Sequence, residues 1–162
     1  MPIIGSGDIA TVLTDREDVT FFASGVSNSR CTDVDEYHRE YMLLINQPRD
    51  RHIVYFSSLC IYTSDTMYAQ HKRTMEAHVR HLFTSYTIVR IGNIDWGENP
   101  NTLINYLRSH PEAEIQNVYR HIISKDEFKY WMGLIQPGVK NEMNVPGRMV
   151  FVPDLFKNLH ND

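Results

Sequence analysis

The chain has 162 residues, of which 42% are hydrophobic and 22% charged, and its formal net charge is −4. These ordinary values fit one globular domain and offer no basic surface field for nucleic acid. No apolar run approaches the length of a membrane span, and the segment MPIIGSGD lacks the features of a signal peptide. Cys31 and Cys60 lie far apart, outside any metal-binding spacing, which favours a reduced cytoplasmic setting without disulfides.

Short apolar segments alternate with longer periodic ones along the chain. Strands are expected at residues 2–4, 19–23, 52–57 and 86–91, each nearly all apolar, as in parallel strands covered on both faces. Helices are expected at residues 8–13, 33–46, 66–83, 100–109 and 125–135. The alternation predicts an α/β fold class, a Rossmann-like three-layer sandwich with a reduced, mostly parallel sheet. We expect residues 1–162 to form a single domain.

The first expected strand runs directly into GSGDIA, a G-x-G-x-x-A turn that opens the first expected helix. Gly5 permits the tight turn, Gly7 lets a pyrophosphate approach the backbone, and Ala10 allows close packing of helix and strand. The predicted cofactor-binding residues of this turn are Gly5, Ser6, Gly7, Asp8 and Ile9. The alternative is a glycine turn that binds nothing.

The second expected strand ends in small residues, Ala23, Ser24 and Gly25. Small residues at the carboxyl end of a parallel strand leave room for a ligand in the crevice of such a sheet. These three residues are therefore further cofactor-binding candidates, although an ordinary loop would have a similar composition.

The third expected strand ends at Ser57 and Ser58, and the next helix carries Tyr68 and Lys72. Residues four apart share a helix face, so both side chains could point toward the serines. A phenol has a pKa near 10, and a neighbouring ammonium is expected to lower the pKa of Tyr68 into a useful acid–base range. Ser58 would hydrogen-bond the substrate oxygen. The alternative is that Tyr68 packs its ring and Lys72 is solvated.

Several motifs in a fixed order carry a family resemblance. The segments GSGDIA, ASG, SSLCIY, YAQHK and YTIVRIGNIDWG together resemble the short-chain dehydrogenase/reductase superfamily. The similarity is greatest to its extended branch of nucleotide-sugar epimerases, dehydratases and reductases. The residues that match the family motifs are Ser58 with Tyr62, Tyr68 with Lys72, and Arg90 with Asn93 and Gly97.

The resemblance extends over nearly the whole chain. RHIISKDEF (120–128) resembles a family segment beside the sugar-nucleotide site, and NVPGRMVFVPDLF (144–156) resembles the closing strand and helix. It implies NAD or NADP as cofactor and a nucleotide-linked sugar as substrate, with residues 93–162 on the substrate side. The implied catalytic residues are Ser58, Tyr68 and Lys72, of which the last two also bind the cofactor, and the implied substrate-binding residues are Ser58, Asn93 and Arg120. A catalytically inactive relative that binds a nucleotide or a protein partner is the alternative.

The chain departs from the family pattern near its start. Only about ten residues separate the first expected helix from the strand at 19–23, where the family has two further strands. The family places an acidic residue for the adenosine ribose about 20 residues past the glycines, and here that position falls in GVSNS. We therefore expect a reduced adenosine half-site and weak discrimination between NAD and NADP.

The remaining candidates favour structural roles. His78 and His81 lie three apart without a third ligand at a usable spacing, so we expect no metal site. The helical spacing of Tyr37, Tyr41 and Leu44 indicates core packing or a subunit contact. The resemblance implies a homodimer formed through the helices at 33–46 and 66–83. We expect neither a nucleic-acid nor a membrane partner.

Overall fold

The structure, a computed structural model, describes residues 2–161. Its main sheet has five strands in the order β1-β2-β3-β4-β7, and every neighbouring pair is parallel. The strands are β1 (Ile3–Ile4), β2 (Val19–Phe22), β3 (His52–Ser58), β4 (Tyr86–Ile91) and β7 (Lys140–Val145). The first four coincide with the expected strands to within one or two residues.

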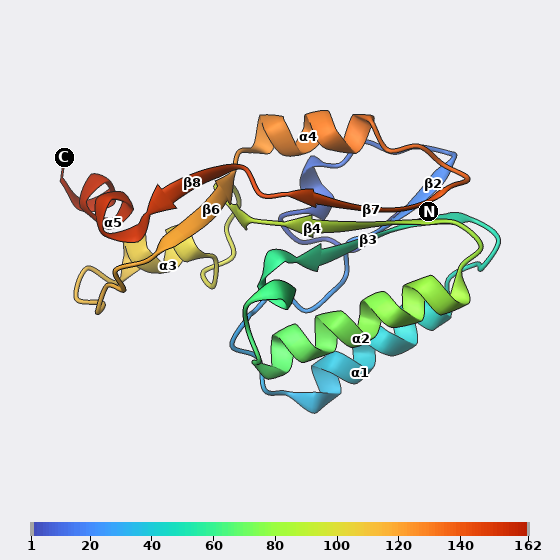
Figure 1. The fold of residues 1–162 in the computed structure, drawn as a ribbon, viewed down its shortest axis with the longest axis horizontal. Coiled ribbons are helices and arrows are strands. Elements are labelled where there is room, and N and C mark those ends of the chain that lie inside the picture. Colours follow the sequence, from blue (N-terminus) through green and yellow to red (C-terminus); the bar gives the residue numbers. More distant parts are fainter. Residues whose placement is uncertain (1, 162) are drawn as a thin grey trace.

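Helices cover both faces of this sheet (Figure 1). Helices α1 (Val34–Ile45) and α2 (Met67–Leu82) lie on one face, and α4 (Lys125–Gly133) lies on the other. The two core clusters follow the same division, with Tyr55, Leu44 and Met75 on the α1/α2 side and Phe56 with Phe128 on the α4 side. The predicted Rossmann-like α/β sandwich is confirmed.

Side-chain caps explain where the main helices begin. The Asp33 carboxylate accepts the amide of Asp35 before α1, and the Thr66 hydroxyl accepts the amide of Ala69 before α2. Ser124 caps α4 in the same way. Each cap satisfies an amide that the first helical turn leaves without a partner. The expected helices at 33–46 and 66–83 therefore begin and end within one residue of α1 and α2.

A second, smaller sheet has the strand order β5-β6-β8, from β5 (Asn93–Ile94), β6 (Tyr119–Ile123) and β8 (Arg148–Phe151). Strands β6 and β8 are antiparallel, and helices α3 (Leu103–Ser109) and α5 (Val152–His160) complete this unit. We call these five elements the small lobe. The carboxyl ends of β3, β4 and β7 point toward it (Figure 1), so it lies at the sheet edge where Rossmann-like folds bind ligands.

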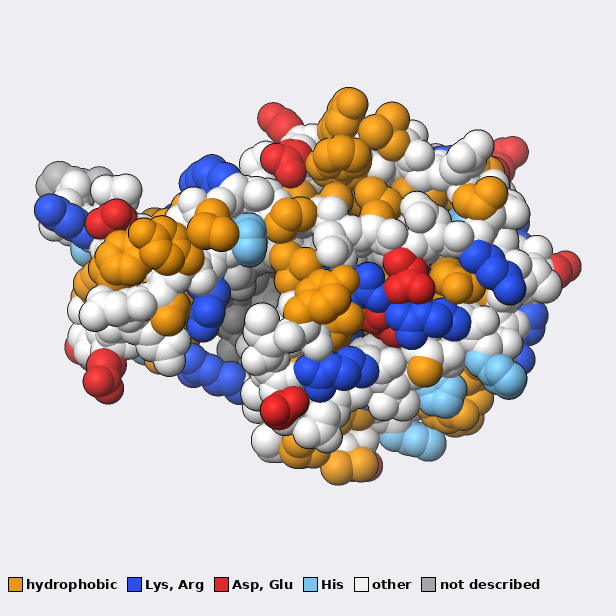
Figure 2. Space-filling view, in the orientation of Figure 1, with side chains coloured by type: hydrophobic (Ala, Val, Ile, Leu, Met, Phe, Trp, Pro, Cys, Tyr) orange, Lys and Arg blue, Asp and Glu red, His pale blue; other side chains and the backbone are white. Residues whose placement is uncertain are grey.

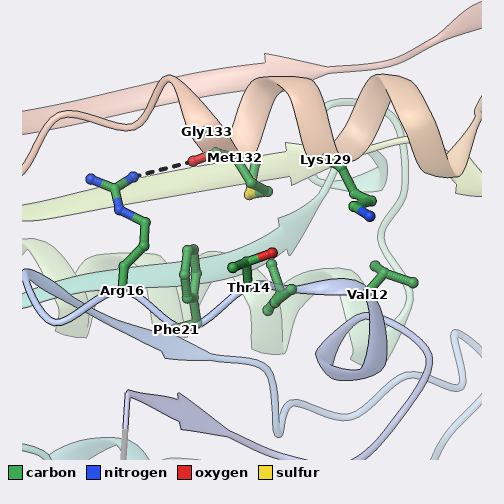
Figure 3. Close-up of a pocket in the computed structure, with 8 residues that line it drawn as sticks. Val12, Thr14, Arg16, Phe21, Lys129, Met132 and Gly133 are labelled. Atoms are coloured by element: carbon green, nitrogen blue, oxygen red, sulfur yellow. Dashed lines mark hydrogen bonds between the residues drawn. The ribbon is translucent and has the colours of Figure 1, made fainter.

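The expected helix at 8–13 is replaced by one 3₁₀ turn, η1 (Ala10–Val12). The residues that follow, 14–18, are all polar and supply no apolar face for a longer helix. A cavity of about 90 Å³ lies between this segment and α4, where Arg16 donates to the carbonyl of Met132 at 3.3 Å (Figure 3). The short turn therefore covers this face of the sheet less fully than a helix would.

No strand was expected to begin at Lys140. Only the last two residues of β7 fall within the segment 144–156, which resembles a closing strand and helix. Its sequence KNEMNV is mostly polar, and its side chains are largely exposed. β7 pairs with β4 on one side only and forms the edge of the sheet. An edge strand lacks the continuous apolar pattern that marks a buried parallel strand.

Candidate functional site

The register of the sheet brings the predicted motifs to one edge. Ile4 pairs with Phe22, and Phe22 pairs with Tyr55. Ser58, three residues further along β3, pairs with Ile91 of β4. The glycine turn, the segment 23–26 (the 23–26 loop) and the end of β3 therefore follow one another along the carboxyl edge of the sheet.

The glycine turn packs tightly against the 23–26 loop. Gly5 has a φ of 123°, and a Cβ built there would lie 2.3 Å from the carbonyl oxygen of Ala23, so only glycine fits. Gly7 differs, because a Cβ there would meet no atom within 4 Å. Within residues 2–161 the backbone amides of 6–9 donate no hydrogen bond. The turn thus offers free donors beside open space, but without the helix dipole expected behind it, because η1 is a single turn.

The carboxylate of Asp8, a predicted cofactor-binding residue, is hydrogen-bonded within the fold. Its carboxylate oxygens accept the amides of Glu98 at 3.1 Å and Asn99 at 3.0 Å. The Trp96 indole donates to the Asp8 carbonyl at 3.0 Å, and Gly97, with a φ of 97°, leaves room for the carboxylate. Asp8 therefore fixes the segment 96–99 against the glycine turn. Ile9 packs against the core under α4.

The 23–26 loop is anchored to helix α1. The Ser24 hydroxyl accepts Arg39 Nη1 at 3.2 Å, and the amide of Val26 donates to Glu40 Oε1 at 2.7 Å. Gly25 lies directly over Lys72, since a Cβ at Gly25 would stand 2.7 Å from Lys72 Nζ. The loop covers the ammonium group.

Lys72 is buried, with 2% of its surface exposed. Its Nζ donates to Glu40 Oε1 and to the Tyr55 hydroxyl, both at 3.3 Å. Tyr55 in turn donates to Glu40 Oε2 at 2.5 Å. The ammonium is thus paired and hydrogen-bonded, as a buried charge requires. A solvated Lys72 is excluded.

Tyr68 and Lys72 share a helix face as expected, and Lys72 Nζ lies 5.5 Å from the centroid of the Tyr68 ring. The lowered pKa expected for Tyr68 is wrong, because burial raises it and the nearby Cys60 and Glu40 raise it further. Glu40 neutralises the ammonium that was expected to favour the phenolate. Within the described chain the Tyr68 hydroxyl makes no hydrogen bond, so it is free to meet a ligand.

Ser58 ends β3 and caps the 3₁₀ turn η2 (Leu59–Tyr62), because its hydroxyl oxygen accepts the amide of Cys60 at 3.2 Å. As a donor, that hydroxyl has no partner among residues 2–161. Tyr62, its motif partner, accepts Arg90 Nη1 at 3.0 Å and donates to Asn144 Oδ1 at 3.2 Å. Ser58 can therefore donate to a ligand while the cap holds it in place.

Arg90 lies at the centre of a second buried charge cluster. Its guanidinium pairs with Glu76 at 2.6 Å and with Glu142, and Ser57 donates to Glu76 at 2.5 Å. Burial by itself lowers the pKa of Arg90, but the hydrogen bonds of Glu76 and Glu142 outweigh it and raise the pKa. Arg80 beside Glu142 lowers the pKa of that carboxyl to about 2. The cluster joins β4, α2 and β7 beneath the site.

The predicted substrate residues Asn93 and Arg120 belong to the small lobe. Asn93 begins β5 and donates to the carbonyl of His121 at 3.0 Å. Arg120 is exposed on β6 and contacts Gln116 Oε1 at 3.4 Å. Lys and Arg side chains gather on the lobe where it meets the main body (Figure 2). Within the described residues no hydrogen bond joins either side chain to Ser58.

Glu40 is the residue that sequence reasoning missed. It is fully buried, and it accepts hydrogen bonds from the 23–26 loop, β3 and α2. A signal was present, because Glu40 stands three residues after Tyr37 and four before Leu44, both of which are buried on the same helix face. A carboxylate at a core position of an amphipathic helix indicates a buried cationic partner.

Solved structures share this fold at low sequence identity. The Bordetella bronchiseptica enzyme WbmG, in complex with NAD and UDP, aligns with a TM-score of 0.70 and 11% identity over 86% of this chain and 54% of its own. The Thermus thermophilus UDP-glucose 4-epimerase in complex with NAD aligns with a TM-score of 0.63 and 10% identity, over 86% of this chain and 60% of its own. The Bacillus cereus UDP-N-acetylglucosamine 4-epimerase aligns with a TM-score of 0.59 and 14% identity, over 84% of this chain and 61% of its own.

At these identities the likeness establishes the Rossmann-like fold. The chain spans little more than half the length of these proteins. No protein-family model and no curated protein matches the sequence. None of the helices within residues 2–161 combines the length and apolar character needed to cross a membrane.

Proposed function

We propose that the chain binds NAD or NADP and acts as an oxidoreductase, epimerase or dehydratase on a nucleotide-linked sugar. The observation that carries the proposal is that the Ser58 and Tyr68 hydroxyls each remain unused as donors within residues 2–161, while the Tyr68 ring lies 5.5 Å from the buried ammonium of Lys72. Tyr55, by contrast, commits its hydroxyl to the fold. The motif resemblance assigns the acid–base roles to this same trio.

A bound nicotinamide supplies hydride exchange. Tyr68, whose pKa is raised by burial, is protonated at neutral pH, and we assign it the transfer of a proton to a substrate oxygen. Ser58 donates a hydrogen bond to the same oxygen while its cap on η2 fixes its position. Lys72 has three N–H donors, and Glu40 and Tyr55 use two. The third remains for a ribose hydroxyl.

The glycine turn fits the pyrophosphate of a dinucleotide. The open space at Gly7 lets an anion approach the amides of residues 6–9, and a side chain at that position would fill the space. The adenosine side is reduced, since β1 is the edge of the sheet and no acidic residue stands at the ribose position. Both NAD and NADP are therefore compatible cofactors.

The small lobe is the proposed binding region for the nucleotide-linked sugar, with Asn93 and Arg120 as its polar contacts. Support comes from its position beyond the strand ends and from its basic side chains (Figure 2). The structure of WbmG, which aligns with this chain at a TM-score of 0.70, was solved in complex with UDP as well as NAD. Both cysteines are free, which suits the proposed cytoplasmic location.

A relative that binds a nucleotide or a protein partner without turnover is the second candidate. The enclosure of Lys72 favours it, because Gly25 and Glu40 cover an ammonium that a cofactor ribose has to reach. The two candidates differ in one respect: only the enzyme converts substrate.

The test is conversion of a panel of UDP-sugars, incubated with the protein and NAD and followed by chromatography. We expect a new sugar isomer or keto-sugar with the wild-type protein and none with Ser58→Ala. Cofactor binding by calorimetry without conversion of any panel member would favour the binding-only candidate.

We also propose a homodimer formed through α1 and α2. A groove of about 320 Å³ runs between these helices, lined by Tyr41, Met75 and His78 among others. Burial of its apolar rings by a second copy would support association. Tyr41→Asp should shift sedimentation toward the monomer, and a wild-type monomer at tens of micromolar would contradict the proposal.

A further inference from the structure

Glu40 has no part in the proposed chemistry, yet its carboxylate is fully buried among polar groups from three other elements. Oε1 accepts the Val26 amide at 2.7 Å and Lys72 Nζ at 3.3 Å, and Oε2 accepts the Tyr55 hydroxyl at 2.5 Å. The Nε2 atom of His71 lies 3.2 Å from Oε1. A desolvated carboxylate with this many partners holds each of them in one arrangement.

Two of these partners belong to the proposed cofactor site or adjoin it. Lys72 comes from α2, and Val26 comes from the 23–26 loop after β2. They meet at Gly25, where a Cβ would lie 2.7 Å from Lys72 Nζ and 3.1 Å from Glu40 Oε1. The loop backbone therefore packs directly on the ion pair, and displacement of either group disturbs the other.

We propose that Glu40 is a positioning residue that fixes the Lys72 ammonium and the 23–26 loop together and thereby sets the direction of the one N–H of Lys72 that remains for a cofactor. This inference rests on the proposed function for the identity of the ligand. The physical basis is the ammonium geometry: Glu40 and Tyr55 hold two of its three donors, which sets the direction of the third. Glu40 itself does not touch the ligand.

Two substitutions release Lys72 by different routes. Glu40→Gln keeps the size of the side chain but removes the charge and replaces one acceptor by an NH₂ donor. Gly25→Ala leaves every charge in place and adds a Cβ 2.7 Å from Lys72 Nζ and 3.1 Å from Glu40 Oε1, so that the ion pair has to shift. Gly7→Ala is the matched glycine control, because a Cβ there meets nothing.

The first readout is the rate at which an amine-specific acylating reagent labels Lys72, measured by peptide mass spectrometry without any ligand. The internal references are four exposed lysines, Lys125, Lys129, Lys140 and Lys157. We expect Glu40→Gln and Gly25→Ala to raise Lys72 labelling by about tenfold or more as its local protection is lost, and Gly7→Ala to leave it unchanged. An unchanged far-UV circular dichroism spectrum shows that the fold is retained. Unchanged Lys72 labelling in both variants would overturn the proposal.

The second readout is NAD affinity by calorimetry in a double-mutant cycle. If Glu40 acts through Lys72, Glu40→Gln weakens binding by about tenfold in the wild-type background and has little effect in Lys72→Met. Equal losses in both backgrounds would show a general structural role and overturn the proposal.

Failure of the proposed function can be distinguished from failure of the role proposed for Glu40. If the wild-type protein binds neither NAD nor NADP, the cofactor assignment fails, while the labelling rates still decide whether Glu40 positions Lys72. If Glu40→Gln does not fold, Glu40→Asp keeps the charge on a side chain one methylene shorter, and the same rise in Lys72 labelling is expected.

Discussion

The two halves of the carboxyl edge are held together in different ways. At β3 and β4, buried charges pair within the fold, Lys72 with Glu40 and Arg90 with Glu76. At β1, a two-residue strand leads into an exposed turn with open space beside Gly7. Substitutions in the first half should therefore disturb stability and chemistry together, whereas substitutions in the second should disturb binding alone.

Tyr68 is the expected exception within the first half, and its removal should have the largest effect on chemistry. Its hydroxyl makes no hydrogen bond within residues 2–161, so Tyr68→Phe should leave the melting temperature nearly unchanged. Turnover on an active sugar nucleotide should fall by about 10² to 10⁴, the usual contribution of a general acid.

The matched control is Tyr130→Phe, on an exposed ring of α4 with 62% of its surface accessible. Turnover should be the same in this variant as in the wild type. Equal turnover in the wild type and in Tyr68→Phe would contradict the assignment of Tyr68 as the general acid.

Glu40→Ala tests the stability of the first half. Loss of one member of a buried ion pair leaves the other charge uncompensated and costs about 3–5 kcal/mol. Urea unfolding should therefore show a large loss for Glu40→Ala, while Gly7→Val should change the free energy of unfolding by less than about 0.5 kcal/mol. Similar losses in the two variants would remove the contrast between the halves.

Acid should weaken the first half through Glu142. Arg80 holds the pKa of Glu142 at about 2 in the folded state, against an ordinary value of 4.5. The stability from this carboxylate is present above about pH 4.5 and is lost as the pH falls toward 2. Urea unfolding between pH 5 and 2 should show a shallower loss in Glu142→Gln than in wild type. Glu114→Gln, in an exposed loop, should match the wild type, and an identical slope for Glu142→Gln would contradict the prediction.

The smallest expected effect is the difference in affinity between NAD and NADP. No acidic residue stands where a carboxylate would repel a 2′-phosphate, so the dissociation constants for NAD and NADP should differ by less than about tenfold. Competition between the two cofactors in one calorimetric titration measures the ratio directly. Strong selectivity for NAD would reveal an adenosine contact outside the expected pattern.

The buried strands could be predicted because their covered faces require continuous apolar sequences. The expected 86–91 strand coincides with β4, and α2 lies within one residue of its expected limits. Strand β7 lacks that requirement at the sheet edge, and the helix expected at 8–13 failed because residues 14–18 offer no apolar face. Local pattern predicts an element only where tertiary burial imposes one.

The shared helix face of Tyr68 and Lys72 was predictable from the sequence, and the electrostatics around them were not. The four-residue spacing placed Tyr68 and Lys72 on one helix face. Burial raises the pKa of Tyr68, and Glu40, which reaches Lys72 from another helix 32 positions away in sequence, raises it further. Contacts of this kind follow from packing between elements, which sequence spacing within one element does not encode.

The most direct test of the dinucleotide site is a calorimetric titration of the wild type and of Gly7→Val with NAD. We expect binding by the wild type and none by the variant at the same concentrations, with equal melting temperatures, because a Cβ at Gly7 meets no atom within 4 Å and the valine side chain extends into the open space beside the turn. Equal NAD affinity in the two proteins, or no binding by the wild type, would contradict the assignment of a dinucleotide site to this turn.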